Sequence, residues 1–344
     1  MLRKSDERRF FQVGGRISQY LAAEHQNKVD SMKNLKGYRF RIYPNEAQKR
    51  FFIETFGCVR FIYNYFLKLD TAERTSEEVI TPASLKRDYP FLKKTDSLAL
   101  ANAKRNLDRA FQNYYQQRSG YPKLKNKSSA WQSYTTNNQN GTVRIEDGYL
   151  KLPKLKEKIQ ICEHRKITGK IKSVTISAKN NEEFYASILC VESIDKFEKT
   201  GKNIRLSFDA HQLVQQAKYR AEVIESIQQT KGRLAFLQRR LKVKARGARK
   251  QNRILADCKN YQKQKKQYDK LLTHFNNQIK DYLNHLSIFY IKEYDVIEIV
   301  EPEDRSCAED ALFTSNEWHQ LVRLLKYKAQ WYGKEIQIIN CQNI

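Results

Sequence analysis

Two short strand-like segments of the sequence end at positions where carboxylates would be needed to hold divalent cations for phosphodiester hydrolysis. The segment NIRLSFDAHQL, Asn203 to Leu213, alternates apolar and polar residues as a strand does, and it offers Ser207 or Asp209 near its end, depending on register. The segment from Tyr294 to Val300 is almost wholly apolar, which is typical of a buried strand in a mixed sheet. Hydrolysis by a pair of cations about 4 Å apart needs several carboxylates at such strand ends. Because the second segment ends in Val300, which cannot bind a cation, the pattern predicts an incomplete set of carboxylates.

Composition indicates a polyanionic partner. The chain has 344 residues, enough for two or three domains, and 64 Lys and Arg against 38 Asp and Glu give a formal charge of +26. No stretch approaches the roughly 18 uninterrupted apolar residues of a membrane-spanning helix. Residues Met1 to Arg16 are charged and lack the apolar core of a secretory leader. We therefore expect no membrane partner and a cytoplasmic, nucleoid-associated location.

Cysteine and histidine spacing gives no metal site. The six cysteines are far apart with no CxxC pair, so the spacing excludes a zinc ribbon and favours buried thiols. The six histidines are equally dispersed. Packing or surface roles are therefore the simpler interpretation of His211 and His319. We expect neither zinc nor a small-molecule cofactor.

The elements that must position these residues follow from periodicity. Residues 1–35 predict a weakly ordered extension, and Met32 is an alternative start. The segment Lys36 to Tyr43 alternates like a strand, and Asn45 is a candidate cap for helical sequence that runs from Glu46 to about Gln117. Short strands with turn signals then recur between Gln132 and Val191, which favours a small β-barrel with the helices inserted into it.

The last third of the chain predicts a different, mixed α/β domain. Two long charged helical segments, Tyr219 to Leu241 and Gln251 to Glu293, are interrupted near Gly247 by the basic run RRLKVKARGARKQNR. This run is either a solvated turn of a helical hairpin or a contact for nucleic-acid backbone. An amphipathic helix from Trp318 to Gly333 and a strand from Glu335 to Ile339 follow.

Several stretches together resemble the TnpB (OrfB) family of transposon-encoded RNA-guided nucleases. The matching runs lie in family order between Lys36 and Ile339: YRFRIYPNEAQ, FGCVRFIYNYFL, LALANAKRNLDRAFQNYY, GYPKLKNK, SYTTNN, IEDGYLKLPKLK, GKIKSVTIS, KEYDVIEI and LLKYKAQWYGKEIQII.

The resemblance implies an α+β multidomain fold. It consists of a small OB-like β-barrel, the wedge, at 36–45 and 119–200, with a helical recognition insert at 46–118. A degenerate, C-terminally truncated RuvC-like domain of RNase H topology would occupy 201–344, with a long helical hairpin and no zinc ribbon.

Departures from the family pattern predict loss of cleavage. The first nuclease motif can be aligned with Ser207 or with Asp209 at the catalytic aspartate, and the second motif places Val300 at the catalytic glutamate. The final aspartate motif would follow Ile339. The resemblance therefore implies a nuclease-dead relative of the repressor type (TldR), not an enzyme, with no catalytic magnesium. The alternatives are an endonuclease using Asp209 and Glu301, and a decayed transposon fragment.

A repressor of this kind would bind a guide RNA and a double-stranded DNA target beside a short adjacent motif, and would block a promoter by occupying an R-loop. The expected readers of the adjacent motif are residues of the insert and the barrel: Arg60, Asn64, Ser97, Leu98, Ala101, Tyr134, Thr135, Thr136, Asn137 and Asn138. The expected contacts to guide RNA are Tyr38, Arg39, Arg41, Lys123, Lys125 and Lys127. The sequence does not predict the oligomeric state.

Overall fold

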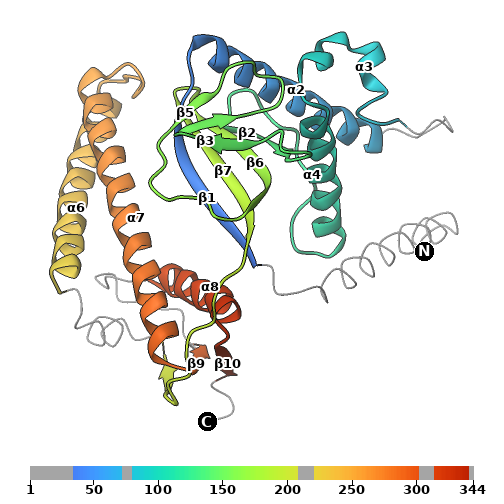
Figure 1. The fold of residues 1–344 in the computed structure, drawn as a ribbon. Helices are drawn as coiled ribbons and strands as arrows, with labels where there is room; N and C mark the ends of the chain where they lie inside the picture. Colours follow the sequence, from blue (N-terminus) through green and yellow to red (C-terminus); the bar gives the residue numbers. More distant parts are fainter. Residues whose placement is uncertain (1–33, 72–79, 208–220, 302–313, 341–344) are drawn as a thin grey trace, which may run out of the picture. The chain divides into compact units, whose positions relative to one another are not determined.

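The chain folds into two units with separate hydrophobic cores. The computed structural model describes residues 34–71, 80–207, 221–301 and 314–340 (Figure 1). The first unit runs to Ser193 and the second begins at Ile194. The weakly ordered extension expected over 1–35, and Asp209 and His211, lie outside the described residues except for residues 34 and 35.

A seven-stranded antiparallel sheet forms the first unit, in the order β2-β6-β7-β1-β5-β4-β3. Its long strands are β1 (Asn34–Tyr43), β2 (Trp131–Asn137), β6 (Lys170–Lys179) and β7 (Glu183–Glu192). Its short strands are β3 (Arg144–Glu146), β4 (Tyr149–Lys151) and β5 (Ile159–Ile161). The strand expected over Lys36 to Tyr43 is confirmed, because alternate residues from Tyr38 to Ile42 enter the core.

The expected closed barrel is wrong. The edge strands β2 and β3 do not pair with each other within the described residues, so the sheet is open. Strands β3, β4 and β5 have three residues each, and a row of such short strands offers few hydrogen bonds with which to close a tilted barrel. The hairpin at Asp147-Gly148 is confirmed, since both residues have positive φ and Glu146 pairs with Tyr149.

Helices lie between β1 and β2 in the chain, as the helical insert was expected to. They are α2 (Glu46–Thr71), α3 (Leu85–Asp88), the 3-10 helix η1 (Pro90–Lys94) and α4 (Ser97–Tyr115). Asn45 caps α2 as predicted: its Oδ1 accepts from Gln48 N at 2.9 Å, and Gln48 Oε1 accepts from Asn45 N at 3.0 Å. Apolar residues of α2 and α4, such as Phe52 and Leu100, share one core with the sheet.

Three parallel strands in the order β10-β9-β8 form the sheet of the second unit. They are β8 (Asn203–Leu206), β9 (Val296–Glu301) and β10 (Glu335–Asn340). The helices are α6 (Ala221–Lys250), α7 (Lys259–Glu293) and α8 (Ser315–Tyr332). Residues of these helices bury Ile297 and Ile299 of β9 in a second core.

The predicted helix break near Gly247 is wrong. Helix α6 continues through Gly247 to Lys250, and the turn lies between it and the start of α7 at Lys259. A glycine inside a helix costs only about 1 kcal/mol relative to alanine, so one glycine does not end a 30-residue helix. Much of the basic run therefore lies on α6 and not in a loop.

Candidate nucleic-acid interface

The carboxyl ends of β8 and β9 meet at the position expected for catalytic carboxylates. Leu206 pairs with Ile299 in parallel register, the last pair of the two strands, and Ser207 and Val300 are the next residues along each chain segment. Asp209 lies outside the described residues, as does the side chain of Glu301.

Among the described side chains of β9, the acidic one is engaged elsewhere. Glu298 Oε2 accepts a hydrogen bond from Arg205 Nε at 2.7 Å, so its charge is already compensated. No group of three or more acidic, histidine or cysteine side chains that could hold a metal ion occurs among the described residues. Because the candidate ligands Asp209 and Glu301 have no described side chains, we derive no step through a cation pair.

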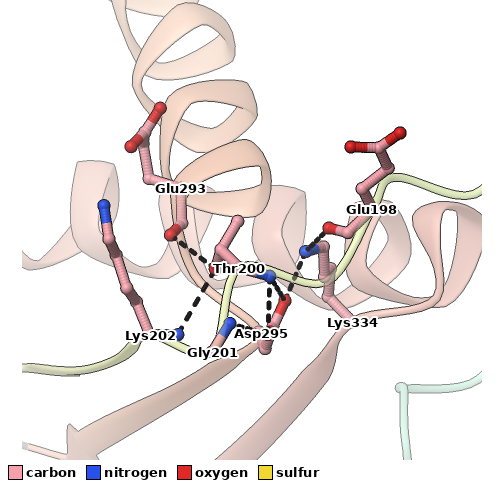
Figure 2. A network of polar contacts seen from close by, with 7 residues as sticks. All are labelled: Glu198, Thr200, Gly201, Lys202, Glu293, Asp295 and Lys334. Atoms are coloured by element: carbon pink, nitrogen blue, oxygen red, sulfur yellow. Dashed lines mark hydrogen bonds and ion pairs between the residues drawn. The ribbon is translucent and has the colours of Figure 1, made fainter.

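At the opposite, amino end of the same strands, Asp295 organises a polar network (Figure 2). Its carboxylate accepts from the backbone nitrogens of Thr200 and Gly201 at 2.9 and 2.6 Å, and from Lys334 Nζ at 2.5 Å. These donors, first the Lys334 ammonium, hold the pKa of Asp295 at about 2. The network ties the segment before β8 to the starts of β9 and β10, which is a structural role.

In the first unit, the expected readers Ser97, Leu98 and Ala101 lie on α4 at its amino end. Ser97 is exposed and accepts from Lys86 Nζ at 2.6 Å, while Leu98 and Ala101 are half-buried. One turn further on, Asn102 Nδ2 donates to the carbonyl oxygen of Thr135 on β2 at 2.9 Å. The contact places this end of α4 against β2, so the two predicted groups of readers are neighbours.

The run Tyr134 to Asn138 is more engaged in the fold than a recognition loop would be. Tyr134 is buried against Phe52 and Phe56, and burial raises its pKa far above the usual range. Thr136 is also buried and donates to the carboxylate of Asp96. These two side chains do not face solvent in the unbound chain.

Three other members of the run are half-buried and partnered. Thr135 shares a hydroxyl hydrogen bond of 2.7 Å with Thr175, and Asn137 Oδ1 accepts from Asn102 at 3.3 Å. Asn138 donates to the carbonyl of Ile171 at 3.1 Å and accepts from Val143 N at 2.9 Å. Contact with a base would therefore replace existing hydrogen bonds.

Arg60 and Asn64, on α2, also hold parts of the chain together. Arg60 Nη1 donates to Gln132 Oε1 at 3.1 Å. Asn64 makes two hydrogen bonds to the backbone of Lys125, accepting from its N at 2.8 Å and donating to its O at 3.0 Å. Asn64 therefore anchors the basic linker to α2.

All three linker lysines, Lys123, Lys125 and Lys127, are exposed. Of these three described lysines, only Lys125 packs its ammonium against a ring. The ammonium of Lys125 lies 4.3 Å from the centre of the Tyr63 ring, and burial lowers its pKa. Lys123 and Lys127, on either side of Lys125, can therefore contact phosphates, while the Lys125 ammonium is held against the Tyr63 ring.

On β1, the three expected RNA contacts separate by face. Tyr38 is buried and donates to Glu192 Oε1 at 2.6 Å. Arg39 is exposed and Arg41 half-buried, and both lie over the ring of Tyr185 on β7, at 4.3 and 4.9 Å from its centre. Strand alternation places the arginines on the solvent side.

Sequence reasoning missed two aromatic residues on that solvent side. Trp131 is 47% exposed, and its ring lies 6.0 Å from that of Tyr185 and 5.4 Å from the Arg39 guanidinium. The alternation of WQSYTTN could have found Trp131, because Tyr134 and Thr136 take the core positions and put Trp131 on the other face.

Comparisons with known proteins agree with the resemblance drawn from the sequence. A family of helix-turn-helix domains, HTH_OrfB_IS605, matches residues 32–78, which include β1 and α2. A Streptomyces pristinaespiralis protein named "Putative RNA-guided DNA endonuclease" is 25% identical over 323 residues, covering 89% of this chain and 77% of the relative. The Escherichia coli (strain K12) protein "Putative RNA-guided DNA endonuclease InsQ" is 22% identical over 342 residues, covering 89% and 80%.

These matches support the TnpB (OrfB) family. They also correct one expectation: the interpretation of the chain as a non-enzyme is wrong, because both relatives are named as endonucleases and the similarity spans 89% of the chain. Neither the nuclease-dead subtype nor the repressor role follows from these relatives. Within the described residues, no helix has the length and apolarity needed to span a membrane.

Proposed function

We propose that the chain binds a guide RNA, uses it to recognise double-stranded DNA, and acts as an RNA-guided DNA endonuclease. The observation that carries the proposal is the similarity to two relatives of that name over 89% of the chain. The formal charge of +26 supports it, since the protein must hold two polyanions at once.

In this proposal, exposed and half-buried side chains contact the two nucleic acids, and buried ones support them. Arg39, Arg41, Lys123 and Lys127 are the cations that guide RNA would meet on the first unit. The amino end of α4, with Ser97 and Ala101, and the neighbouring Asn137 on β2 would contact the DNA beside the guide-paired segment. Tyr38, Tyr134 and Thr136 would support these surfaces from the core.

Cleavage would depend on carboxylates near the ends of β8 and β9. Asp209 and Glu301 are the candidates, as the two acidic residues that follow Ser207 and Val300 most closely. DNA occupancy has a consequence of its own, because a complex seated across a promoter blocks transcription whether or not it cuts.

The experiment isolates the protein with its bound RNA, sequences that RNA, and incubates the complex with matching DNA and magnesium. We expect one defined RNA species and cleavage that Asp209→Ala abolishes, with Asp257→Ala, an exposed aspartate between α6 and α7, as the matched control. Random cellular RNA would overturn the guided mechanism. Guide-dependent protection of DNA that stays intact would overturn the endonuclease and leave guided recognition standing.

A further inference from the structure

We propose that the solvent face of strands β2, β6, β7 and β1 is a platform on which single-stranded guide RNA stacks. Trp131 and Tyr185 would supply the ring surfaces, and Arg39 and Arg41 the cations for phosphates. The inference rests on the proposed function and names how part of the guide RNA is held.

Strand register brings these residues onto one face. Across the sheet, Ser133 pairs with Ser177, Ser177 with Tyr185, and Tyr185 with Arg41. Paired residues of antiparallel strands point to the same side, and residues two apart along a strand share that side. Trp131 and Arg39 therefore lie on the face that carries Tyr185, while neighbours in sequence such as Phe184 fill the core.

The rings and guanidinium groups on this face already contact one another in the unbound chain. The Arg39 guanidinium lies near both rings, 4.3 Å from the centre of Tyr185 and 5.4 Å from that of Trp131. Arg41 contacts the Tyr185 ring and forms a salt bridge of 3.2 Å with Glu183. Stacked arginines lose less freedom when they bind phosphate, and Trp131, 47% exposed, keeps ring surface for a base.

The rest of the face favours RNA over DNA. Its central positions carry small hydroxyl side chains: Ser133, Thr135, Ser173, Thr175, Ser177 and Ser187. A ribose 2′-hydroxyl both donates and accepts hydrogen bonds, as these side chains do, and it is the group that distinguishes RNA from DNA. An open antiparallel sheet with exposed rings is also a known geometry for reading unpaired bases.

The carboxylate of Glu183 competes with RNA phosphates for Arg41. It accepts from the Tyr185 hydroxyl at 2.9 Å and pairs with Arg41, and both contacts lower its pKa. A phosphate that approaches Arg41 competes with this carboxylate. Removing Glu183 should therefore strengthen binding of RNA, a gain of function that general damage to the fold would not produce.

The test uses the full chain, freed of bound nucleic acid, and a fluorescein-labelled, unstructured single-stranded RNA of mixed sequence followed by anisotropy. DNA of the same sequence and an RNA duplex are the comparison probes. The variants are Trp131→Ala, Trp131→Phe, Arg39→Ala and Glu183→Gln. The matched controls are Tyr149→Ala, which removes another ring that is 45% exposed on β4, and Arg144→Ala on β3.

We expect Trp131→Ala to weaken binding of single-stranded RNA about tenfold or more, Trp131→Phe much less, and Glu183→Gln to strengthen it, since a stacked base is worth about 1–3 kcal/mol. The controls should stay within about twofold of wild type. Equal loss in the controls, or no loss in Trp131→Ala, overturns the platform. Tighter binding of DNA overturns the choice of RNA, and neither result bears on guided DNA cleavage, which is measured separately.

Discussion

Single residues in this chain often act through the backbone of distant segments. Asn64 binds both backbone groups of Lys125, and Asn102 binds the carbonyl of Thr135, so each side chain replaces a missing secondary-structure partner. Such amides are polar and partly exposed, which in the sequence alone makes them candidates for ligand contact. The geometry gives them a positioning role: Asn64 holds the basic linker, and Asn102 holds α4 against β2.

Asp295 gives the residue-scale prediction on pH. Its pKa is about 2 in the folded chain against about 3.9 in an unfolded one, because Lys334 and two backbone nitrogens stabilise the carboxylate. A carboxylate with a depressed pKa stabilises the fold at all pH values above about 4, and this contribution disappears as pH falls from about 4 to about 2. Asp295→Asn should remove that pH-dependent contribution.

The measurement is the free energy of unfolding in urea for wild type and Asp295→Asn between pH 7 and pH 2. The difference between them should be greatest at neutral pH and shrink across the stated window. Asp257→Asn is the control, since this exposed aspartate lies in the same unit. A difference that does not change with pH would contradict the role given to the Asp295 charge.

At the scale of elements, local sequence patterns predict strands and helices well, but they predict poorly whether a sheet closes into a barrel. Alternation placed β1 and β7 correctly because their core residues, such as Phe40 and Phe184, occur at every second position. The barrel was wrong because closure depends on whether β2 meets β3, a pairing that no local pattern encodes. The break at Gly247 was wrong because packing of α6 against α7 outweighs the propensity of one residue.

The candidate site shows the same limit. The sequence predicts that Arg39 and Arg41 project from β1 because they alternate with Tyr38 and Phe40. It does not predict that Trp131, some ninety positions later, lies against Arg39, because two other strands separate them in the sheet. The sequence also places Tyr134 among the expected readers of DNA. Its burial depends on contacts with Phe52 and Phe56 of α2, which the local pattern does not show.

Gly169 gives the element-scale prediction. A side chain at this position would overlap the carbonyl oxygen of Val191 and the Cγ of Glu192, next to the contacts that Glu192 makes with Tyr38 and Lys36. Because the backbone of β7 would have to move, Gly169→Ala should cost about 1–3 kcal/mol of unfolding free energy.

Gly37 provides the matched control for this change. It lies in β1 of the same sheet, and an added methyl group would meet nothing within 4 Å. Chemical denaturation of both variants should therefore show a clear loss of stability for Gly169→Ala and none for Gly37→Ala. Equal stabilities of the two variants would contradict the close approach of Gly169 to β7.

At the scale of the whole molecule, the net positive charge governs the binding of nucleic acid. The excess of 64 basic over 38 acidic residues extends through both units, so a bound polyanion can meet cations along most of its path. Binding of single-stranded RNA should then release counterions, and the logarithm of affinity should fall linearly with the logarithm of salt concentration. With about 6–10 phosphate contacts, affinity should drop by several orders of magnitude between about 50 and 200 mM salt.

The slope of that line also separates the two kinds of contact on the proposed platform. Arg39→Ala removes a phosphate contact and should reduce the slope by about 0.7, the value per phosphate of a single strand. Trp131→Ala removes a stacking surface, which carries no charge, and should lower affinity at every salt concentration while leaving the slope unchanged. Anisotropy titrations across a salt series measure both quantities together. A slope that Trp131→Ala changes and Arg39→Ala does not would reverse the assignment of the ring to bases and of the guanidinium to phosphates.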